Sequence, residues 1–126
     1  MNLRGVGVDL ADAGRLRRLL DAHGERFAHR WFAGPEVAEC ESEPVPAVAY
    51  ACRFAAKEAV WKALAVPWDG SLPWRWIVVA AAAGTPEVEL RGRVADAARL
   101  AGVTSVRVSW SSSGDLATAV ALAYTG

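Results

Sequence analysis

The spacing of apolar side chains along the chain predicts alternating strands and helices. Residues 3–10 alternate small and β-branched side chains, which indicates a short strand, and Asp12 is placed to cap a helix running to about residue 23. The next patterns predict two short helices and then the longest helix of the chain: residues 25–32, 35–42 and 45–65. The first half of the chain is therefore expected to be one strand followed by helices.

The second half is richer in strand patterns. After a loop with several turn-forming residues, four segments favour strands: residues 74–82, 87–92, 104–110 and 116–124. A helix over residues 93–101, stopped by Gly102, separates the two pairs. The late strands are separated by hairpin-length turns, so a doubly wound parallel sheet is less favoured. The pattern predicts the α+β class, with one long helix among paired strands.

The length and the net charge of the chain limit the classes of function to consider. The 126 residues are expected to form one domain over residues 1–126, and the formal net charge of zero gives no general attraction to nucleic acid or to an anionic membrane. No apolar run reaches the roughly 18 residues that a membrane span needs. Cys40 and Cys52 show no paired spacing, and no secretory leader precedes them, so we expect reduced thiols in a cytoplasmic protein.

The long helix carries both lysines of the chain, Lys57 and Lys62, on either side of Glu58. At 100° per residue, mostly small apolar side chains form one broad arc, which we expect to be buried: Val48, Cys52, Ala55, Ala56, Ala59, Val60 and Ala63. Arg53 and Lys57 lie opposite this arc at i,i+4 spacing, as do Glu58 and Lys62. This second face is either an ordinary solvated surface or a site for phosphates and a hard metal ion.

The segment GVGVD at residues 5–9 supplies a second carboxylate. Gly5 and Gly7 let another backbone or a ligand approach closely, and Asp9 ends the predicted strand. Asp9 and Glu58 are the type of oxygen ligands that Mg²⁺ takes together with water and substrate phosphates. An aspartate at this position is also common as a simple turn or helix cap.

Two longer motifs together resemble a known family. GVGVDLADAGRL at residues 5–16 and RFAAKEAVWKAL at residues 53–64 closely resemble the holo-acyl-carrier-protein synthases, the small single-domain class of 4′-phosphopantetheinyl transferases. GTPEVEL and the segment VRVSWSSSGDLATAVA at residues 106–121 are similar to later motifs of that family. The resemblance implies its fold, in which an antiparallel sheet wraps around one long helix with short additional helices.

The resemblance also implies an activity. Family members are Mg²⁺-dependent enzymes that transfer the 4′-phosphopantetheine group of coenzyme A to a serine of an apo acyl carrier protein, in fatty acid or polyketide biosynthesis. They are usually homotrimers with active sites at subunit interfaces, so Asp9 and Glu58 are either from one chain or from neighbouring chains. Either Asp9 or a metal-bound water is expected to accept the serine proton.

Each candidate residue takes its role from the family motif it matches. Asp9 and Glu58 match the metal-binding carboxylates, and Lys62 matches the lysine that serves the departing phosphate; these three are the expected catalytic residues. Arg53 and Lys57, with Lys62, match positions near the nucleotide phosphates of coenzyme A. Arg15 matches a position that meets the acidic recognition helix of the carrier protein.

The chain also departs from the family pattern. Ser112 stands where a histidine is usual, so this position can hydrogen-bond a phosphate of coenzyme A but brings no charge, and Ala65 stands where a glycine usually follows the long helix. Several tryptophans lie near these departures, as packing residues or as the lining of an altered apolar pocket: Trp61, Trp68, Trp74, Trp76 and Trp110. The alternative function is a repurposed relative that binds a carrier protein, or acts on a carrier-bound biosynthetic intermediate, without performing the transfer.

Overall fold

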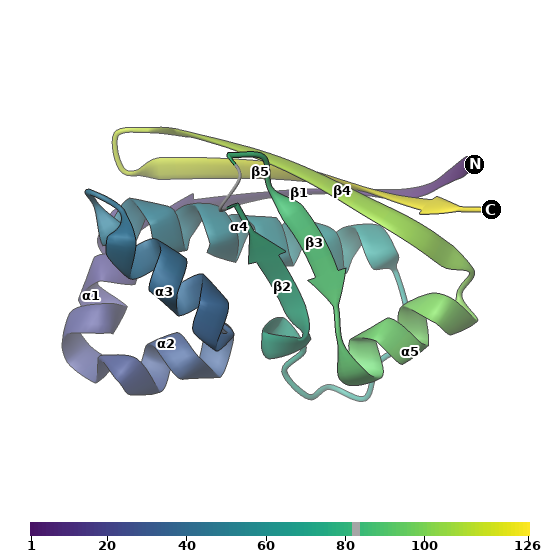
Figure 1. Cartoon of the computed structure of the whole chain (residues 1–126), viewed down its shortest axis with the longest axis horizontal. Coiled ribbons are helices and arrows are strands. Elements are labelled where there is room, and N and C mark those ends of the chain that lie inside the picture. Colours follow the sequence, from purple (N-terminus) through teal and green to yellow (C-terminus); the bar gives the residue numbers. More distant parts are fainter. Residues whose placement is uncertain (82–83) are drawn as a thin grey trace.

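The computed structural model describes residues 1–81 and 84–126 (Figure 1). The helices are α1 (Ala13–His23), α2 (Glu25–Trp31), α3 (Gly34–Ser42), α4 (Pro46–Leu64), the 3₁₀ turn η1 (Trp74–Trp76) and α5 (Gly92–Leu100). The strands are β1 (Asn2–Asp12), β2 (Ile77–Ala80), β3 (Glu87–Leu90), β4 (Val103–Ser113) and β5 (Leu116–Thr125). These elements confirm the α+β class.

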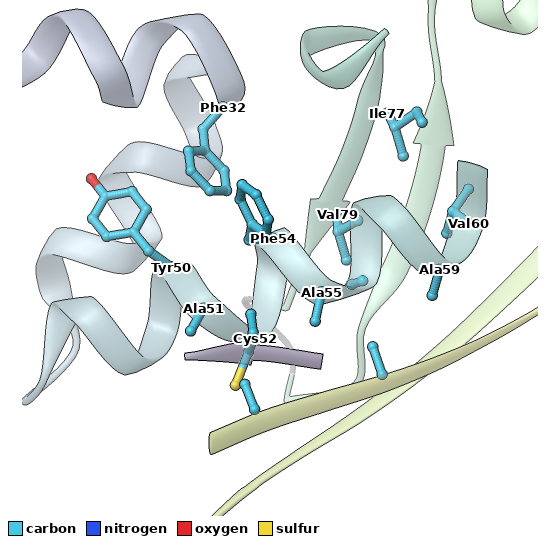
Figure 2. Close-up of a cluster of buried hydrophobic side chains, with 14 of the residues drawn as sticks. Phe32, Tyr50, Ala51, Cys52, Phe54, Ala55, Ala59, Val60, Ile77 and Val79 are labelled. Atoms are coloured by element: carbon cyan, nitrogen blue, oxygen red, sulfur yellow. The ribbon is translucent and has the colours of Figure 1, made fainter. Parts of the chain in front are cut away.

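The long helix α4 lies along one face of a three-stranded antiparallel sheet with strand order β1–β5–β4 (Figure 1). Its other side is covered at one end by α1, α2 and α3 and at the other by the antiparallel pair β2–β3, with α5 beyond (Figure 1). Figure 2 shows that α4 packs against both layers: Cys52 points toward the strands, whereas Tyr50 and Phe54 point toward the short helices. The helix is therefore the centre of the core.

Small residues allow the backbone of α4 to approach the sheet very closely. A Cβ atom added to Gly5 would lie 2.2 Å from the Ala63 carbonyl oxygen, and one added to Gly7 would lie 1.8 Å from that of Ala59. On the neighbouring strand β5, the residues that face α4 are buried alanines: Ala117, Ala119, Ala121 and Ala123. The two glycines of GVGVD thus make room for a helix backbone, and they bring Asp9 alongside α4.

Several predicted elements differ from the structure at their ends, two of them in ways that matter for the site. Trp74–Trp76 form the 3₁₀ turn η1, so β2 begins only at Ile77; residue 82, which the expected strand included, lies outside the described residues. Strand β4 continues to Ser113, and the turn to β5 is only Gly114 and Asp115. The serines extend β4 because they pair with β5, and a glycine at φ 57° closes the tight hairpin.

Candidate active site

Asp9, Glu58 and Lys62 come together where β1 crosses α4. The ammonium group of Lys62 donates hydrogen bonds to Asp9 Oδ1 and to the Val8 carbonyl oxygen, both at 3.0 Å. Glu58 lies one turn earlier on α4 than Lys62 and is half-buried. Both carboxylates and the lysine thus lie together within one chain.

Glu58 is an unusually weak acid. Burial, and after it the neighbouring carboxyl group of Asp9, raise its pKa to about 7, against the opposing charges of Lys62 and Arg15. The second oxygen of Asp9, Oδ2, is buried and has no hydrogen-bond partner among the described residues. Two crowded carboxyl groups with an unused oxygen form a site that a cation would stabilise.

The two carboxylates, Asp9 and Glu58, suit Mg²⁺ better than a metal ion whose ligands all come from the protein. Within residues 1–81 and 84–126, no group of three or more His, Cys, Asp or Glu side chains is arranged to hold a metal. Mg²⁺ commonly binds through one or two carboxylates and completes its shell with water and substrate phosphates. Asp9 and Glu58 therefore fit Mg²⁺ that is bound together with a phosphate-containing substrate.

The expectation that Lys57 lies on an open face of α4 is wrong. Its side chain is completely buried, and its ammonium group donates to Glu36 Oε1 at 2.7 Å, to the Trp74 carbonyl oxygen at 2.8 Å and to the Ile77 carbonyl oxygen. These three acceptors match the three ammonium hydrogens. Burial lowers the pKa of Lys57, and the charge of Glu36 opposes that shift. This geometry leaves Lys57 no hydrogen for a phosphate and gives it a structural role.

Arg53 is also buried, contrary to expectation. It donates to Glu39 Oε1 at 2.7 Å and to the Ala49 carbonyl oxygen at 3.2 Å, and its guanidinium lies 5.1 Å from the ring centre of Trp110. Its Nε has no partner among the described residues, and the side chain lines a pocket of about 410 Å³. Arg53 thus keeps unused donors, Nε among them, and lines a cavity, whereas Lys57 keeps none.

The acidic partners of Arg53 and Lys57 were missed in the sequence. Glu36 accepts hydrogen bonds from Ala33 N and Val79 N in addition to Lys57, so it ties α3, α4 and β2 together. Glu36 and Glu39 are three residues apart on one helix, and Arg53 and Lys57 are four apart on another. Such matching spacings put each pair on one helix face, and they are the signal from which helix-to-helix ion pairs were predictable.

Ser112 lies on β4, the edge strand opposite to β1, which carries Asp9. In the sheet register, Asp9 on β1 is opposite Ala119 on β5, which is opposite Trp110 on β4, and Ser112 is two pairs further along. Because β5 lies between β1 and β4, the two edge strands are roughly 10 Å apart. Ser112 lies next to Cys52 on α4, the residue before Arg53, and Trp110 on the same strand packs against Arg53. These side chains form a second group, separate from the Asp9–Glu58–Lys62 cluster.

Arg15 extends the first group toward the surface. It is exposed on α1, directly after the turn in which Asp12 Oδ1 accepts a hydrogen bond from Gly14 N at 2.9 Å. Its charge acts to lower the pKa of Glu58, against the shift that burial causes. Arg15 also lines a surface groove of about 670 Å³ between α1 and α2.

The tryptophans near the departures pack mainly against one another. Trp61 meets Trp68 edge to face with ring centres 5.0 Å apart, Trp68 meets Trp76 at 6.1 Å, and Trp74 stacks on Trp31 at 4.9 Å. These contacts favour the packing interpretation over an altered ligand pocket. Trp110 is different, since it packs against Arg53 and lines the pocket beside it.

Ala65 keeps the backbone conformation that a glycine favours. It ends α4 with φ 49° and ψ 49°, in the left-handed region, and it is the only non-glycine residue with positive φ among those the structure describes. Arg4 donates to the carbonyl oxygens of Leu64 and Ala65, at 3.0 and 3.1 Å, and so caps the helix end. The replacement thus leaves the chain reversal intact at the cost of local strain.

Comparisons with known proteins agree with this arrangement. A family model described as the 4′-phosphopantetheinyl transferase superfamily matches residues 5–121. The holo-[acyl-carrier-protein] synthase of Anaeromyxobacter dehalogenans (strain 2CP-C) is 40% identical over 121 residues, which cover 94% of this chain and 93% of that protein.

Solved structures give the same result for the fold. The crystal structure of holo-[acyl-carrier-protein] synthase from Neisseria meningitidis has a TM-score of 0.86 and 30% identity, covering 98% of this chain and 99% of that one. An ACPS–CoA complex from Chronobacterium ammoniagenes has a TM-score of 0.85 and 27% identity, covering 96% of each chain. No helix in the described part of the chain combines the length and apolar character needed to cross a bilayer. The match over most of the sequence and these relatives show that the chain belongs to the 4′-phosphopantetheinyl transferase superfamily, as a member of its holo-[acyl-carrier-protein] synthase family.

Proposed function

We propose that this protein transfers the 4′-phosphopantetheine group of coenzyme A to a serine of an apo acyl carrier protein, and that the transfer requires Mg²⁺. The observation that carries the proposal is the cluster of Asp9, Glu58 and Lys62, which combines an unpartnered carboxylate oxygen with a half-exposed ammonium group. Relatives named as holo-[acyl-carrier-protein] synthases, and a related structure named as a complex with CoA, support the same activity.

Transfer between a diphosphate and a hydroxyl needs alignment and charge neutralisation more than covalent help from the protein. Asp9 and Glu58 would hold Mg²⁺, which when bound neutralises charge on the diphosphate. Lys62 uses two hydrogens, for Asp9 and Val8, so one remains for a phosphate oxygen. Its compact ammonium can also give a proton to the departing phosphate, which a guanidinium does poorly.

The carrier protein would dock on the groove beside Arg15. The groove is lined by three arginines, Arg15, Arg26 and Arg30, and by apolar side chains that include Phe27 and Trp31. These arginines make no salt bridge or hydrogen bond with the described residues, so their charges are available to an acidic partner. The groove adjoins the catalytic cluster through Arg15, which suits delivery of the carrier serine.

The protein would assemble as a homotrimer. The outer face of β1 exposes apolar side chains, with Val6, Val8 and Leu10 each more than half exposed, and Val120 extends this face onto β5. Such an apolar stripe favours burial against another copy. The separation of the Arg53–Ser112 group from Lys62 also supports sites completed between copies. Light scattering in solution tests this: a monomer at micromolar concentration would contradict it.

One observation favours the alternative of a relative that binds a carrier but performs no transfer. Ser112 supplies no charge, and the Arg53 guanidinium is already paired with Glu39, so the second group offers little free positive charge for a nucleotide. Replacing Ser112 with histidine tests whether the missing charge limits the transfer. A gain in transfer by Ser112→His would mean that the missing histidine limits a working enzyme, whereas no gain would mean that the site operates around serine.

The direct test is intact-mass analysis of several apo carrier proteins incubated with the protein, coenzyme A and Mg²⁺. We expect the mass of a carrier to increase by one phosphopantetheine group, and we expect Asp9→Asn and Glu58→Gln to abolish the increase. Glu87→Gln, which alters an exposed carboxylate on β3, is the matched control and should remain active. No increase on any carrier would contradict the transferase and favour the carrier-binding relative.

A further inference from the structure

A second basic pocket lies beside the groove that contains Arg15. It has a volume of about 540 Å³, and its lining includes Arg30 from the end of α2, Arg75 from η1 and Arg91 from the start of α5. The remaining lining is uncharged and includes Leu72 and Trp76. Three arginines from three separate elements thus converge on one partly apolar hollow.

Two of the three arginine charges in this pocket are not cancelled by a neighbouring acidic side chain among the described residues. No acidic side chain is among the described residues that line it, and Arg30 and Arg75 make no salt bridge or hydrogen bond within residues 1–81 and 84–126. Only Arg91 is paired, with Glu89 at 2.6 Å, and both of these side chains are exposed. On a chain whose formal net charge is zero, the pocket is a concentrated positive patch.

The pocket and the Arg15 groove are parts of one surface. Arg30 and Leu72 line both hollows, and Leu72 is 48% exposed between them. Arginines therefore run from α1, across α2, to η1 and α5, with an exposed leucine in the middle of the band. Arrays of this kind, with an apolar centre and charged margins, are typical of protein-binding surfaces.

The pocket is separate from the residues that we propose carry out the transfer. Asp9, Glu58 and Lys62 are absent from its lining, and so is Arg53, which lines a different pocket. An anion bound at Arg75 would thus not be the diphosphate that the catalytic cluster holds. The length of the arginine band and the apolar residues at its centre favour a protein surface as the binding partner over a free phosphate.

We propose that the docking surface for the carrier protein extends beyond α1 and α2 into this pocket, where Arg75 and Arg91 bind a second acidic segment of the carrier and Leu72 and Trp76 contact an apolar side chain of it. This inference rests on the proposed transferase function and deepens it. It makes Arg75, on the short turn before β2, a determinant of which carriers are modified. Because the contact is remote from the reacting atoms, it acts on carrier affinity rather than on the chemical step.

The test compares Arg75→Glu with the parent in steady-state transfer, at varied carrier concentration and saturating coenzyme A. Arg75 is exposed and forms no hydrogen bond with the described residues, so its replacement should leave the fold intact. We expect the KM for the carrier to increase about three- to tenfold, and its dependence on salt to weaken, with kcat and the KM for coenzyme A unchanged. Arg99→Glu, on the exposed side of α5 and outside the pocket, is the matched control.

Other results would overturn the inference. An unchanged KM for the carrier in Arg75→Glu would exclude the extended surface while leaving the transferase intact. A rise in the KM for coenzyme A would mean that the pocket holds the nucleotide instead. If the parent transfers nothing, the proposed function fails, and direct binding of a fluorescent apo carrier to the parent and to Arg75→Glu then decides the surface alone: equal affinities would contradict it.

Discussion

The two lysines of α4 occupy opposite environments although they are only five residues apart. Lys57 is sealed between α4, α3 and β2, with Glu36 and two backbone carbonyl groups as its acceptors. Lys62 is 53% exposed and pairs with Asp9, whose second oxygen is free. One ion pair is closed to solvent and fully satisfied; the other is open and incomplete.

This difference separates stability from chemistry along one helix. A buried ion pair contributes little net free energy relative to an apolar pair, but removing one partner leaves a costly isolated charge. An exposed pair contributes little to stability, so its residues are free to serve a substrate. The fold therefore depends on Lys57, and the proposed reaction depends on Lys62.

The largest expected effect is on the closed pair. Lys57→Ala should lower the free energy of unfolding by about 3–5 kcal/mol, because it leaves the carboxylate of Glu36 buried without its cation. Urea unfolding followed by tryptophan fluorescence measures this change. Glu36→Gln, which keeps the shape of the side chain, is the variant to use if Lys57→Ala does not fold. A loss below 1 kcal/mol for both would remove the distinction between the pairs.

The open pair should behave in the opposite way. Lys62→Ala should lower turnover about a hundredfold, since the departing phosphate loses its proton donor, and should change stability by less than about 1 kcal/mol. Steady-state transfer assays and urea unfolding of the same sample measure both quantities. Lys62→Arg keeps the charge, so it should retain coenzyme A binding but recover little turnover. Turnover within a few-fold of the parent in Lys62→Ala would exclude the proposed role.

The pH dependence of the affinity for Mg²⁺ tests the site around the open pair. Burial and the neighbouring Asp9 raise the pKa of Glu58 to about 7, so below this pH a proton competes with Mg²⁺ for its carboxylate. The apparent affinity for Mg²⁺ should fall by about tenfold per pH unit below 7 and level off above it. Titration of activity with Mg²⁺ between pH 5.5 and 8.5 measures this slope. Glu58→Asp, which keeps the charge on a shorter side chain, is the variant for comparison. An unchanged affinity for Mg²⁺ across this pH range in the parent would show that Glu58 is not a ligand.

The smallest effect concerns the end of α4 that follows Lys62. Ala65→Gly should increase the free energy of unfolding by about 0.5–1 kcal/mol, because glycine adopts the left-handed conformation without strain. Ala101→Gly is the control: Ala101 ends α5 at φ −81°, where alanine is unstrained, so that variant should lose a few tenths of a kcal/mol. Thermal unfolding measures both. A destabilised Ala65→Gly would contradict the strain at this helix end.

Much of the fold follows directly from local patterns. The alternation in residues 3–10 predicted β1, Asp12 was expected to cap α1 and does so, and the short helix expected over residues 35–42 is present as α3. The strand ends were less predictable. Trp74–Trp76 suit a strand by composition, yet they form a 3₁₀ turn because their rings pack into the tryptophan cluster.

The site residues likewise divide into those that the sequence predicted correctly and those that it did not. The two motifs placed Asp9, Glu58 and Lys62 as one group, and the fold brings them together. The face of Arg53 and Lys57 was predicted wrongly, because the helical period separates charged from apolar residues only when one side of a helix meets water. Helix α4 is covered on nearly all sides, so its charged residues required buried partners.

By itself, the sequence determined the order of the elements and the family motifs, because hydrophobic period, capping residues and turn residues act over a few neighbouring positions. Only the tertiary structure decided which lysine is sealed and which is open. That outcome depends on Glu36, which lies 21 residues from Lys57 in the sequence and reaches it only after α3 packs on α4. The arginine band of Arg15, Arg30 and Arg75 arises in the same way, because a surface patch gathers side chains by position in space rather than by distance along the chain.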